Sequence, residues 1–317
     1  MNSDNYCSCE VHACYLFLQL SPSFNCSSGT RQQVQSRIKY ETDENVHARA
    51  TRGSKTGHRS CSSYLDYLRD KQAISENIIL AELDVVMLHN DPSEDATSRP
   101  WARLAGINFA MRQGVLVVND SEGLTQAVNK LYLQQFPAKV RPTSLITRDR
   151  NQIKEVSAEM GGTIVLTPLV GSGGHNVFLL RPEDIPNANQ MIDTVSRDGY
   201  IIAQQYLPDA IHGDTRLFML NGQPLCHKGQ YAALRRLRSD GDMRNNMTAG
   251  ASSAPAIIND DILEIAKLIR PQLLHDGMFF VGQDIVGNKL MEINVFSPRG
   301  LESASAFTNI KFNQVII

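Results

Sequence analysis

The chain has 317 residues, of which 42% are hydrophobic and 20% charged, and its formal net charge is −2. This composition is ordinary for a globular protein, and the small net charge gives no reason to expect nucleic acid or an anionic membrane surface as a partner. No apolar run approaches the ~20 residues of a membrane span. The weak apolar stretch at residues 14–20 follows Asp4 and Glu10 rather than a basic segment, so we expect a cytoplasmic protein without a secretory signal.

The cysteines gather near the N-terminus, at Cys7, Cys9, Cys14, Cys26 and Cys61, and Cys226 lies far from the rest. His12 adds one more candidate ligand, but the C-x-C-x₄-C spacing matches no standard zinc template. We therefore expect reduced thiols in a cytoplasmic protein rather than a metal site.

The N-terminal part is predicted to be a parallel α/β domain over residues 36–125. Residues 1–35 are rich in Ser, Asn, Cys and Gln without a sustained period, and we expect them to form a poorly ordered leader. Helices are predicted at residues 62–71 and 99–113, and buried strands at residues 83–88 and 115–118. Asn119 and Asp120 then cap a further helix that has Leu124, Val128 and Leu131 at its apolar positions. The alternation of strands and helices indicates parallel pairing.

The C-terminal part, residues 126–317, is predicted to mix strands and helices, so the fold class is α/β with α+β character in this part. It starts with a helix that carries Lys130. Further helices are expected at residues 149–160 and 261–275, and strands at residues 144–147, 161–169, 177–180, 200–207 and 217–220.

A glycine-rich segment, Val170-Gly171-Ser172-Gly173-Gly174-His175-Asn176, joins two of these strands. Such a loop can place several backbone N–H groups on a phosphate chain. It lacks the Gly-Lys-Ser/Thr ending of a Walker loop and does not open a helix. A plain flexible hairpin therefore fits these residues equally well.

A β-hairpin is predicted near the C-terminus, with its turn at Gly287-Asn288. The period of two places Glu292 and Asn294 on one face of the returning strand, where Asp284 can meet them from the opposite strand. Two carboxylates and a carboxamide are suitable ligands for a hard cation such as Mg²⁺ bound to a phosphate. The alternative is a solvated strand face with polar residues at every second position.

Basic residues are dense just before this hairpin, at Arg235, Arg236, Arg238 and Arg244. Such density is usually a solvated face. Because the arginines precede a carboxylate-rich hairpin, a cationic pocket for anionic substrates is the alternative.

Taken together, these motifs resemble the ATP-grasp ligases, and most of all bacterial glutathione synthetases. The resemblance covers roughly residues 81–312, and more weakly residues from about 35. It rests on the order of a strand with the glycine-rich loop, Ala203-Gln204-Gln205-Tyr206-Leu207-Pro208, Gly213-Asp214-Thr215-Arg216, Met243-Arg244-Asn245-Asn246, and Asp284 with Met291-Glu292-Ile293-Asn294. Residues 83–92 and Val118-Asn119-Asp120 match the N-terminal domain of that family. It implies an N-terminal α/β domain followed by an ATP-grasp fold of two α+β subdomains, at residues 126–207 and 208–317. It also implies a ligase that joins γ-glutamylcysteine to glycine with ATP and Mg²⁺ or Mn²⁺, through an acyl phosphate, in a homo-oligomer.

The resemblance implies roles for individual residues by their motif positions. Metal ligands are implied at Asp284, Glu292 and Asn294. Contacts to the nucleotide are implied at Lys130, Thr167, Gly171, Ser172, Gly173, Gly174, Gln204, Gln205, Tyr206, Leu207 and Asp214. Contacts to substrate carboxylates and acyl-phosphate oxygens are implied at Arg216, Arg236, Arg244 and Asn246, although the match of Arg236 could belong to Arg235.

The chain departs from the family's pattern at Thr167, where relatives carry a lysine that holds nucleotide phosphate oxygens. Arg299 replaces the small residue usual at its position, and the first ~30 residues do not resemble the family's opening strand and loop. Three readings therefore remain: an active glutathione synthetase, an ATP-grasp ligase with another substrate pair, and a catalytically impaired nucleotide-binding relative.

Overall fold

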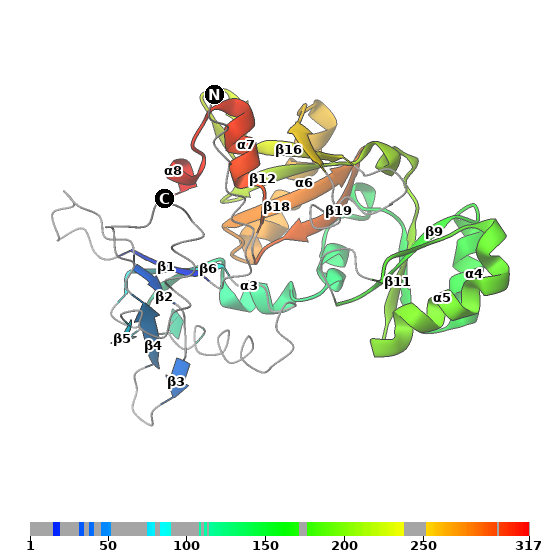
Figure 1. Cartoon of the computed structure of the whole chain (residues 1–317), viewed down its shortest axis with the longest axis horizontal. Coiled ribbons are helices and arrows are strands. Elements are labelled where there is room, and N and C mark those ends of the chain that lie inside the picture. Colours follow the sequence, from blue (N-terminus) through cyan, green and yellow to red (C-terminus); the bar gives the residue numbers. More distant parts are fainter. Residues whose placement is uncertain are drawn as a thin grey trace, which may run out of the picture. The chain divides into compact units, whose positions relative to one another are not determined.

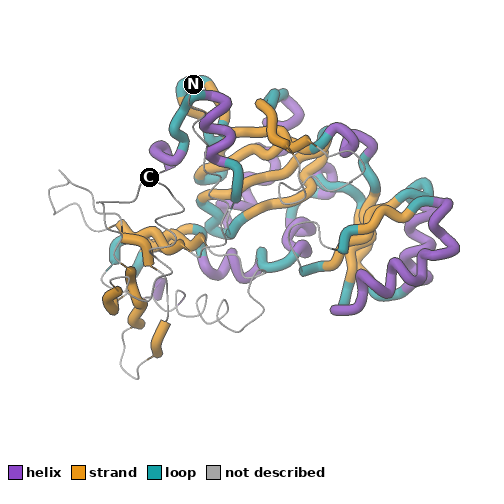
Figure 2. Tube along the Cα trace, in the orientation of Figure 1, coloured by secondary structure: helices purple, strands orange, loops and turns teal. Residues whose placement is uncertain are grey.

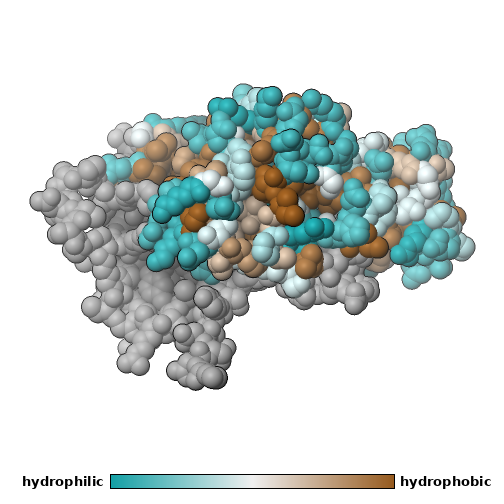
Figure 3. Space-filling model, turned by 90° about the horizontal axis from the view of Figure 1, so that it is seen from above, coloured by the Kyte–Doolittle hydropathy of each residue, from teal (hydrophilic) through white to brown (hydrophobic). Residues whose placement is uncertain are grey.

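The computed structural model divides the chain into two compact units, Met1–Thr125 and Gln126–Ile317. The structure describes residues 15–19, 32–34, 38–40, 46–51, 75–79, 83–89, 108, 111–112, 114–170, 176–237, 252–296 and 298–316. Within these ranges, no helix is both long and apolar enough to cross a membrane. The described surface visible in Figure 3 is mainly hydrophilic and is interrupted by small hydrophobic patches.

The first unit contains a seven-stranded sheet with the order β3-β4-β2-β1-β6-β7, and β5 pairs with β4. The strands are β1 (Tyr15–Gln19), β2 (Gln32–Val34), β3 (Ile38–Tyr40), β4 (Val46–Thr51), β5 (Ser75–Ile79), β6 (Val85–His89) and β7 (Leu116–Val118). The expected parallel pairing holds for β6 and β7, but the other described pairs are antiparallel.

One expectation for this unit is corrected, and one lies outside the described residues. Strands β1 and β2 lie inside residues 1–35, where we expected a poorly ordered leader, and β1 pairs along β6. A strand whose partner is distant in sequence need not show a sustained period, since tertiary pairing can override local pattern. The helix expected at residues 62–71 lies outside the described residues, and Asn108, Met111 and Arg112 of the helix expected at 99–113 are helical.

The predicted helix after Asp120 is shorter than expected. Asp120 caps α3 (Ser121–Gln126), and its carboxylate accepts hydrogen bonds from the backbone N–H groups of Glu122 and Gly123. Val128 and Leu131 are not part of α3, because Asn129 caps a separate 3₁₀ helix, η3 (Lys130–Gln135), by accepting from the Leu131 N–H at 2.9 Å. Lys130 therefore begins a new element.

The second unit starts with a small antiparallel sheet in the order β10-β9-β11-β8. Its strands are β8 (Ser144–Thr147), β9 (Ile164–Pro168), β10 (Phe178–Leu180) and β11 (Ile201–Gln205). Figure 1 shows α4 (Arg150–Glu159) and α5 (Ala188–Val195) side by side next to this sheet. Their apolar residues Ile153, Ile192 and Val195 join Ile164, Leu166, Leu180, Ile201 and Ala203 of the strands in one buried cluster.

The larger sheet of this unit has the order β17-β16-β12-β18-β19. Its strands are orange in Figure 2, where helices are purple. They are β12 (Asp214–Leu220), β16 (Ala233–Leu237), β17 (Ser252–Pro255), β18 (Phe280–Val286) and β19 (Lys289–Asn294). The short strand β13 (Gln223–Pro224) pairs with β12, and β14 (Cys226–His227) pairs with β15 (Gln230–Tyr231). The remaining α-helices of the second unit are α6 (Asp260–His275), α7 (Leu301–Thr308) and α8 (Asn313–Ile316). The same unit contains the 3₁₀ helices η4 (Ala138–Val140), η5 (Pro182–Asn187), η6 (Ser196–Asp198) and η7 (Pro208–His212).

The pairing register assigns the two faces of this sheet. Directly opposed residues share a face, so Phe218, which pairs with Gly282, lies on the same face as Arg216, which pairs with Asp284. The apolar part of this face is buried in a cluster of Phe218, Leu225, Ala232, Leu234, Ala304 and Phe312 that includes α7. The remaining part of the same face carries the charged residues described next.

Candidate functional site

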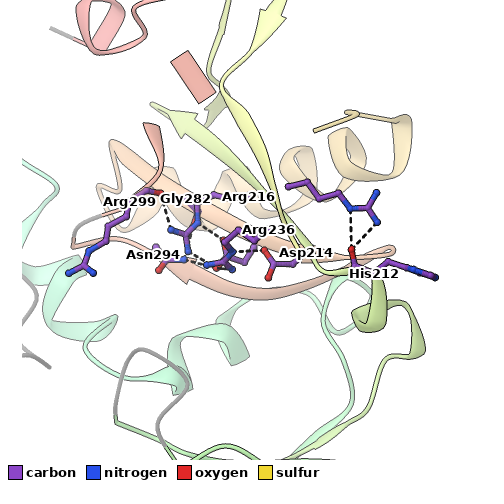
Figure 4. A network of polar contacts seen from close by, with 9 residues as sticks. His212, Asp214, Arg216, Arg236, Gly282, Asn294 and Arg299 are labelled. Atoms are coloured by element: carbon purple, nitrogen blue, oxygen red, sulfur yellow. Dashed lines mark hydrogen bonds and ion pairs between the residues drawn. The ribbon is translucent and has the colours of Figure 1, made fainter. Parts of the chain in front are cut away.

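The charged residues of the predicted metal and substrate site converge on one face of the large sheet. Asp214 pairs with Arg236 between β12 and β16, and Arg216 pairs with Asp284 between β12 and β18. Figure 4 shows that the side chains of Arg216 and Arg236 both point toward this centre. Period-two alternation thus brings together residues that are 68 positions apart in the chain.

Arg216 and Asp284 form a buried two-pronged ion pair. Nε and Nη2 of Arg216 each donate to one carboxylate oxygen of Asp284 at 2.7 Å. The side chains are only 7% and 2% exposed. Nη1 of Arg216 also donates to the Arg299 backbone carbonyl at 3.0 Å, which ties the loop before α7 to the sheet. These three hydrogen bonds hold the guanidinium of Arg216 in one orientation.

Arg236 bridges two carboxylates. Its Nε donates to Asp214 at 2.7 Å, and its Nη2 donates to Asp284 Oδ2 at 2.6 Å. The neighbouring Arg235 bonds instead to the His212 carbonyl, at 3.0 and 3.2 Å, and is exposed. Strand alternation turns Arg235 to the other face, so Arg236 is the one of these two arginines that shares the face of Asp284, and its role as a substrate contact stays a prediction.

The hairpin of β18 and β19 is as predicted, with Asp284 opposite Glu292 and Gly282 opposite Asn294. Nδ2 of Asn294 donates to Asp284 Oδ2 at 3.1 Å. The register shifts between Asp284 and Ile285, so Met291 is an extra residue on β19. This bulge was not visible in the sequence, because period-two counting assumes regular pairing.

The burial of this cluster changes the pKa values of its members. Burial, reinforced by the charge of Asp284, raises the pKa of Asp214 to about 6, although the Arg236 guanidinium counteracts this. Burial would raise the pKa of Asp284 as well, but Arg216 and Arg236 outweigh it and lower the pKa. Burial would lower the pKa of Arg236, yet attraction by Asp284 and Asp214 raises it, so the guanidinium stays charged.

The predicted metal ligands fit a hard divalent cation in chemistry. Asp284 and Asn294 are in contact, Glu292 lies opposite Asp284, and all three offer oxygen atoms. Within the described ranges, no three His, Cys, Asp or Glu side chains form a metal-binding group, and the predicted set instead combines two carboxylates with the carboxamide of Asn294. Both carboxylate oxygens of Asp284 accept hydrogen bonds from arginines, so the guanidinium groups contact the same oxygens that are predicted to bind the metal.

Of the predicted nucleotide contacts, Thr167, Gln204 and Gln205 lie on strands of the small sheet and Lys130 adjoins it, whereas Asp214 lies on β12 of the large sheet. The backbone N–H of Lys130 donates to Leu169 at 3.0 Å, directly after β9, the strand that carries Thr167. Thr167 is 7% exposed, and its hydroxyl makes a long 3.4 Å bond to the Pro168 carbonyl. Gln204 is buried at the end of β11 and contacts Met291 Sδ at 3.7 Å, which links the small sheet to the hairpin.

Some predicted residues cannot be placed. Gly171, Ser172, Gly173 and Gly174 of the glycine-rich loop, and Arg244 and Asn246, lie outside the described residues. Gln205, Tyr206 and Leu207 follow Gln204 at the end of β11, where they are half-buried. Cys226 is exposed and carries a free thiol, whereas the other cysteines also lie outside the described residues.

Two contributors to the site were missed from sequence. The Arg299 carbonyl holds Arg216, and Gly282 allows this loop to approach, since a Cβ there would lie 3.1 Å from Pro298. Gly213 likewise permits the close pairing of β12 and β16, because it has φ +89 and a Cβ there would lie 1.9 Å from the Arg236 carbonyl. Gly213 was visible in the sequence as part of a motif, but its close contact with the Arg236 carbonyl was not.

Comparison with known proteins shows which family and which solved structures the chain is similar to. A family model described as prokaryotic glutathione synthetase, ATP-grasp domain, matches residues 129–309. The chain is 36% identical over 237 residues to a glutathione synthetase of Vibrio vulnificus, which covers 74% of this chain and 72% of that protein. Among solved structures, a D-cycloserine synthetase has a TM-score of 0.55 at 16% identity, covering 78% of this chain and 87% of that one. D-alanyl-alanine synthetase A of Vibrio cholerae has a TM-score of 0.52 at 10% identity, covering 94% and 85%, and at such identities these two likenesses concern the fold alone.

Proposed function

Because the chain belongs to the prokaryotic glutathione synthetases, whose matched region is an ATP-grasp domain, we propose that it is an ATP-dependent ligase that joins γ-glutamylcysteine to glycine. The observation that carries this proposal is the juxtaposition of Asp284 and Asn294 with Arg216 and Arg236 on one sheet face. A ligase that works through an acyl phosphate needs oxygen ligands for a metal and guanidinium groups for phosphoryl oxygens in one place.

The reaction has two steps. The carboxylate of the dipeptide attacks the γ-phosphorus of ATP, the bond to ADP breaks, and an acyl phosphate forms. The glycine amine then adds to the acyl carbon, the C–O bond to phosphate breaks, and the amine loses a proton to solvent. Negative charge develops on the phosphoryl oxygens and on the tetrahedral intermediate, and we assign its neutralisation to Arg216 and Arg236, with Arg244 and Asn246 as further substrate contacts.

Asp284, Glu292 and Asn294 are the residues that we propose to hold Mg²⁺ or Mn²⁺. The ion would offset the charge of the nucleotide phosphates. Their position supports this role, because they share the face of the sheet that carries both arginines. Asp214 borders the same cluster through Arg236 and is proposed to lie beside the nucleotide.

The nucleotide is proposed to bind along the small sheet. Its adenine would contact the backbone of Gln204, Gln205, Tyr206 and Leu207, where β11 ends. Its phosphates would lie near Lys130 and the loop of Gly171, Ser172, Gly173 and Gly174. The attachment of Lys130 to Leu169 supports this arrangement, because it holds the start of η3 beside the strand that leads into the loop.

A second candidate function is a catalytically impaired nucleotide-binding relative, and Thr167 favours it. The hydroxyl of Thr167 is neutral and already contacts the Pro168 carbonyl, so it offers little to a phosphate oxygen. The third reading, a ligase with a different substrate pair, would use the same metal and nucleotide residues and differ only in the contacts to donor and acceptor.

The test is a ligation assay with the full chain, ATP, Mg²⁺, γ-glutamylcysteine and glycine, in which both ADP and glutathione are measured. The proposal predicts equal amounts of the two products, and Glu292→Gln should lower both. ADP release only with other dipeptides or amine acceptors would support the ligase with a different substrate pair. ATP binding without ADP release on any substrate pair would support the impaired relative.

Oligomeric state is a separate prediction. We propose a homo-oligomer on the basis of the family resemblance, and light scattering on the purified protein tests it. A mass of 35.2 kDa across a range of concentrations would show a monomer instead.

A further inference from the structure

We propose that Arg236 is an exchangeable internal cation, whose guanidinium bridges Asp214 and Asp284 and releases them when a divalent metal binds at Asp284. This inference rests on the proposed metal site at Asp284, Glu292 and Asn294. It adds a step that the resemblance does not imply: the same side chain would stabilise the empty site and then become available to an anionic substrate.

The contacts of Asp284 identify Arg236 as the group that can leave. Oδ2 of Asp284 accepts from Arg216 at 2.7 Å, from Arg236 at 2.6 Å and from Asn294 at 3.1 Å. A carboxylate oxygen has two lone pairs, so three donors on one atom exceed its favourable directions. If Arg236 departs, Asp284 keeps its paired bonds to Arg216 and is not left as an uncompensated buried charge.

The two arginines differ in how firmly they are held. Arg216 bonds Asp284 through two nitrogens and the Arg299 carbonyl through the third, so every nitrogen of its guanidinium is used. The hydrogen bonds of Arg236 described above go to single oxygens of two different carboxylates, and its side chain is 13% exposed against 7% for Arg216. Arg236 also lies near the end of β16, next to the segment that leads to Arg244. Arg236 therefore has fewer of the described hydrogen bonds to break than Arg216.

The balance of charge supports an exchange. Asp214, Asp284 and Glu292 face two guanidinium groups, and Glu292 is close enough to Arg236 to act on its charge. These five residues carry one net negative charge when all are ionised. Replacing Arg236 by a divalent cation makes the cluster neutral, whereas adding the cation with Arg236 still in place gives an excess positive charge at low dielectric, which is costly.

The consequence is a coupling between metal binding and substrate binding. A guanidinium released from Asp214 and Asp284 is a planar donor suited to carboxylate or phosphoryl oxygens. The metal thus frees a cation for the anionic substrate, and by thermodynamic linkage the substrate anion should strengthen metal binding by the same factor.

The first experiment measures the affinity of the full chain for Mn²⁺ alone, without nucleotide, by electron paramagnetic resonance. Arg236→Met should bind Mn²⁺ roughly 10-fold more tightly than the wild type, because the competing cation is gone. Arg235→Met is the matched control and should leave the affinity unchanged, since Arg235 bonds only the His212 carbonyl in the described contacts. Arg236→Lys, which keeps the charge, should stay near the wild type. Unchanged or weaker binding in Arg236→Met would overturn the proposal, and Arg236→Gln takes its place if the methionine variant does not fold.

The second experiment observes the exchange directly in the wild type. The Arg236 Nε–H resonance is assigned in the nitrogen-15 spectrum by its loss in Arg236→Lys, and Mg²⁺ is then added without nucleotide. The Arg236 signal should shift or disappear, whereas the Arg216 signal should remain. An unchanged Arg236 signal in a protein that binds Mn²⁺ would overturn the exchange and leave the proposed ligase intact. If no variant binds Mn²⁺, with or without ATP, and no ADP is released, the proposed function fails as well.

Discussion

Arg216 and Asp284 lie directly opposite each other on β12 and β18, and their side chains form two parallel hydrogen bonds of 2.7 Å inside the sheet face. The pair is nearly inaccessible to solvent, so each charge depends on the other for compensation. It supports the site in two ways, because it orients Asp284 and also anchors the loop that contains Arg299.

Breaking this pair should destabilise the protein strongly. Arg216→Met leaves the Asp284 carboxylate with a reduced set of donors in a buried position and should lower the free energy of unfolding by about 3–5 kcal/mol. Urea denaturation followed by far-UV circular dichroism measures this loss in the free energy of unfolding. Arg235→Met, on the other face of the same sheet, should change it by no more than about 0.5 kcal/mol.

The double variant Arg216→Met with Asp284→Leu separates the pair from its individual charges. Removing both ions avoids an unpaired buried charge, so the double variant should be more stable than Arg216→Met alone. A double variant that is less stable by the sum of the two single losses would show that the two residues do not act as a pair.

The elements of the second unit were largely predictable, because their signals are local. The turn at Gly287-Asn288 and the helices expected at residues 149–160 and 261–275 have their signals within the element itself, and each prediction is confirmed, the helices as α4 and α6. The ATP-grasp fold, inferred from the order of motifs, is confirmed as well.

What could not be predicted depends on contacts between distant segments. Antiparallel pairing of β1 with β6 replaces the fully parallel sheet that strand–helix alternation suggested. The bulge at Met291 and the bridge of Arg236 between Asp214 and Asp284 follow from the pairing register of separate strands. The sequence identified the residue types of the site, but it could not show that arginines already occupy the oxygens of Asp284.

Gly213 should be intolerant of a side chain, and Gly229 provides the matched control. Both have positive φ, +89 and +74, but a Cβ at Gly213 would lie 1.9 Å from the Arg236 carbonyl, whereas nothing lies within 4 Å of one at Gly229. Gly229→Ala should cost about 1 kcal/mol for the backbone conformation alone. Gly213→Ala should cost at least about 3 kcal/mol, because β16 must also move away. Thermal unfolding of the two variants tests the difference, and equal losses would contradict it.

Asp276 should make stability depend on acid pH. Its carboxylate accepts hydrogen bonds from Tyr132 at 2.7 Å, from Gln272 at 2.9 and 3.0 Å, and contacts His275 Nδ1 at 2.8 Å. Burial would raise the pKa of Asp276, but the hydrogen bonds from Gln272, His275 and Tyr132 outweigh it and lower the pKa below its usual 3.8.

A carboxylate whose folded pKa is lowered contributes stability above its unfolded pKa, and this contribution disappears as the pH falls through the folded pKa. Asp276→Asn should therefore reduce stability at neutral pH, and the difference from the wild type should shrink below about pH 4. Chemical denaturation from pH 6 to pH 3 measures it. Asp193→Asn removes a half-exposed pair with Arg150 and should show a much smaller pH-dependent difference. A constant difference for Asp276→Asn across this range would contradict the prediction.

Thr167→Lys should strengthen nucleotide binding. Thr167 is buried on β9, two residues before Leu169, whose carbonyl accepts from the backbone N–H of Lys130 at the start of η3. Its neutral hydroxyl makes a long bond to the next carbonyl. A lysine there would add a charge-assisted bond to a phosphate oxygen, worth roughly 1.5–3 kcal/mol, or about 10- to 100-fold in affinity. Calorimetric titration with ATP and Mg²⁺ measures the gain. Thr167→Met is the control, since methionine has similar length without charge and should give no comparable gain. If Lys and Met variants bind ATP equally, size rather than charge limits this position, and if ligation appears only in the lysine variant, the natural chain is the impaired relative.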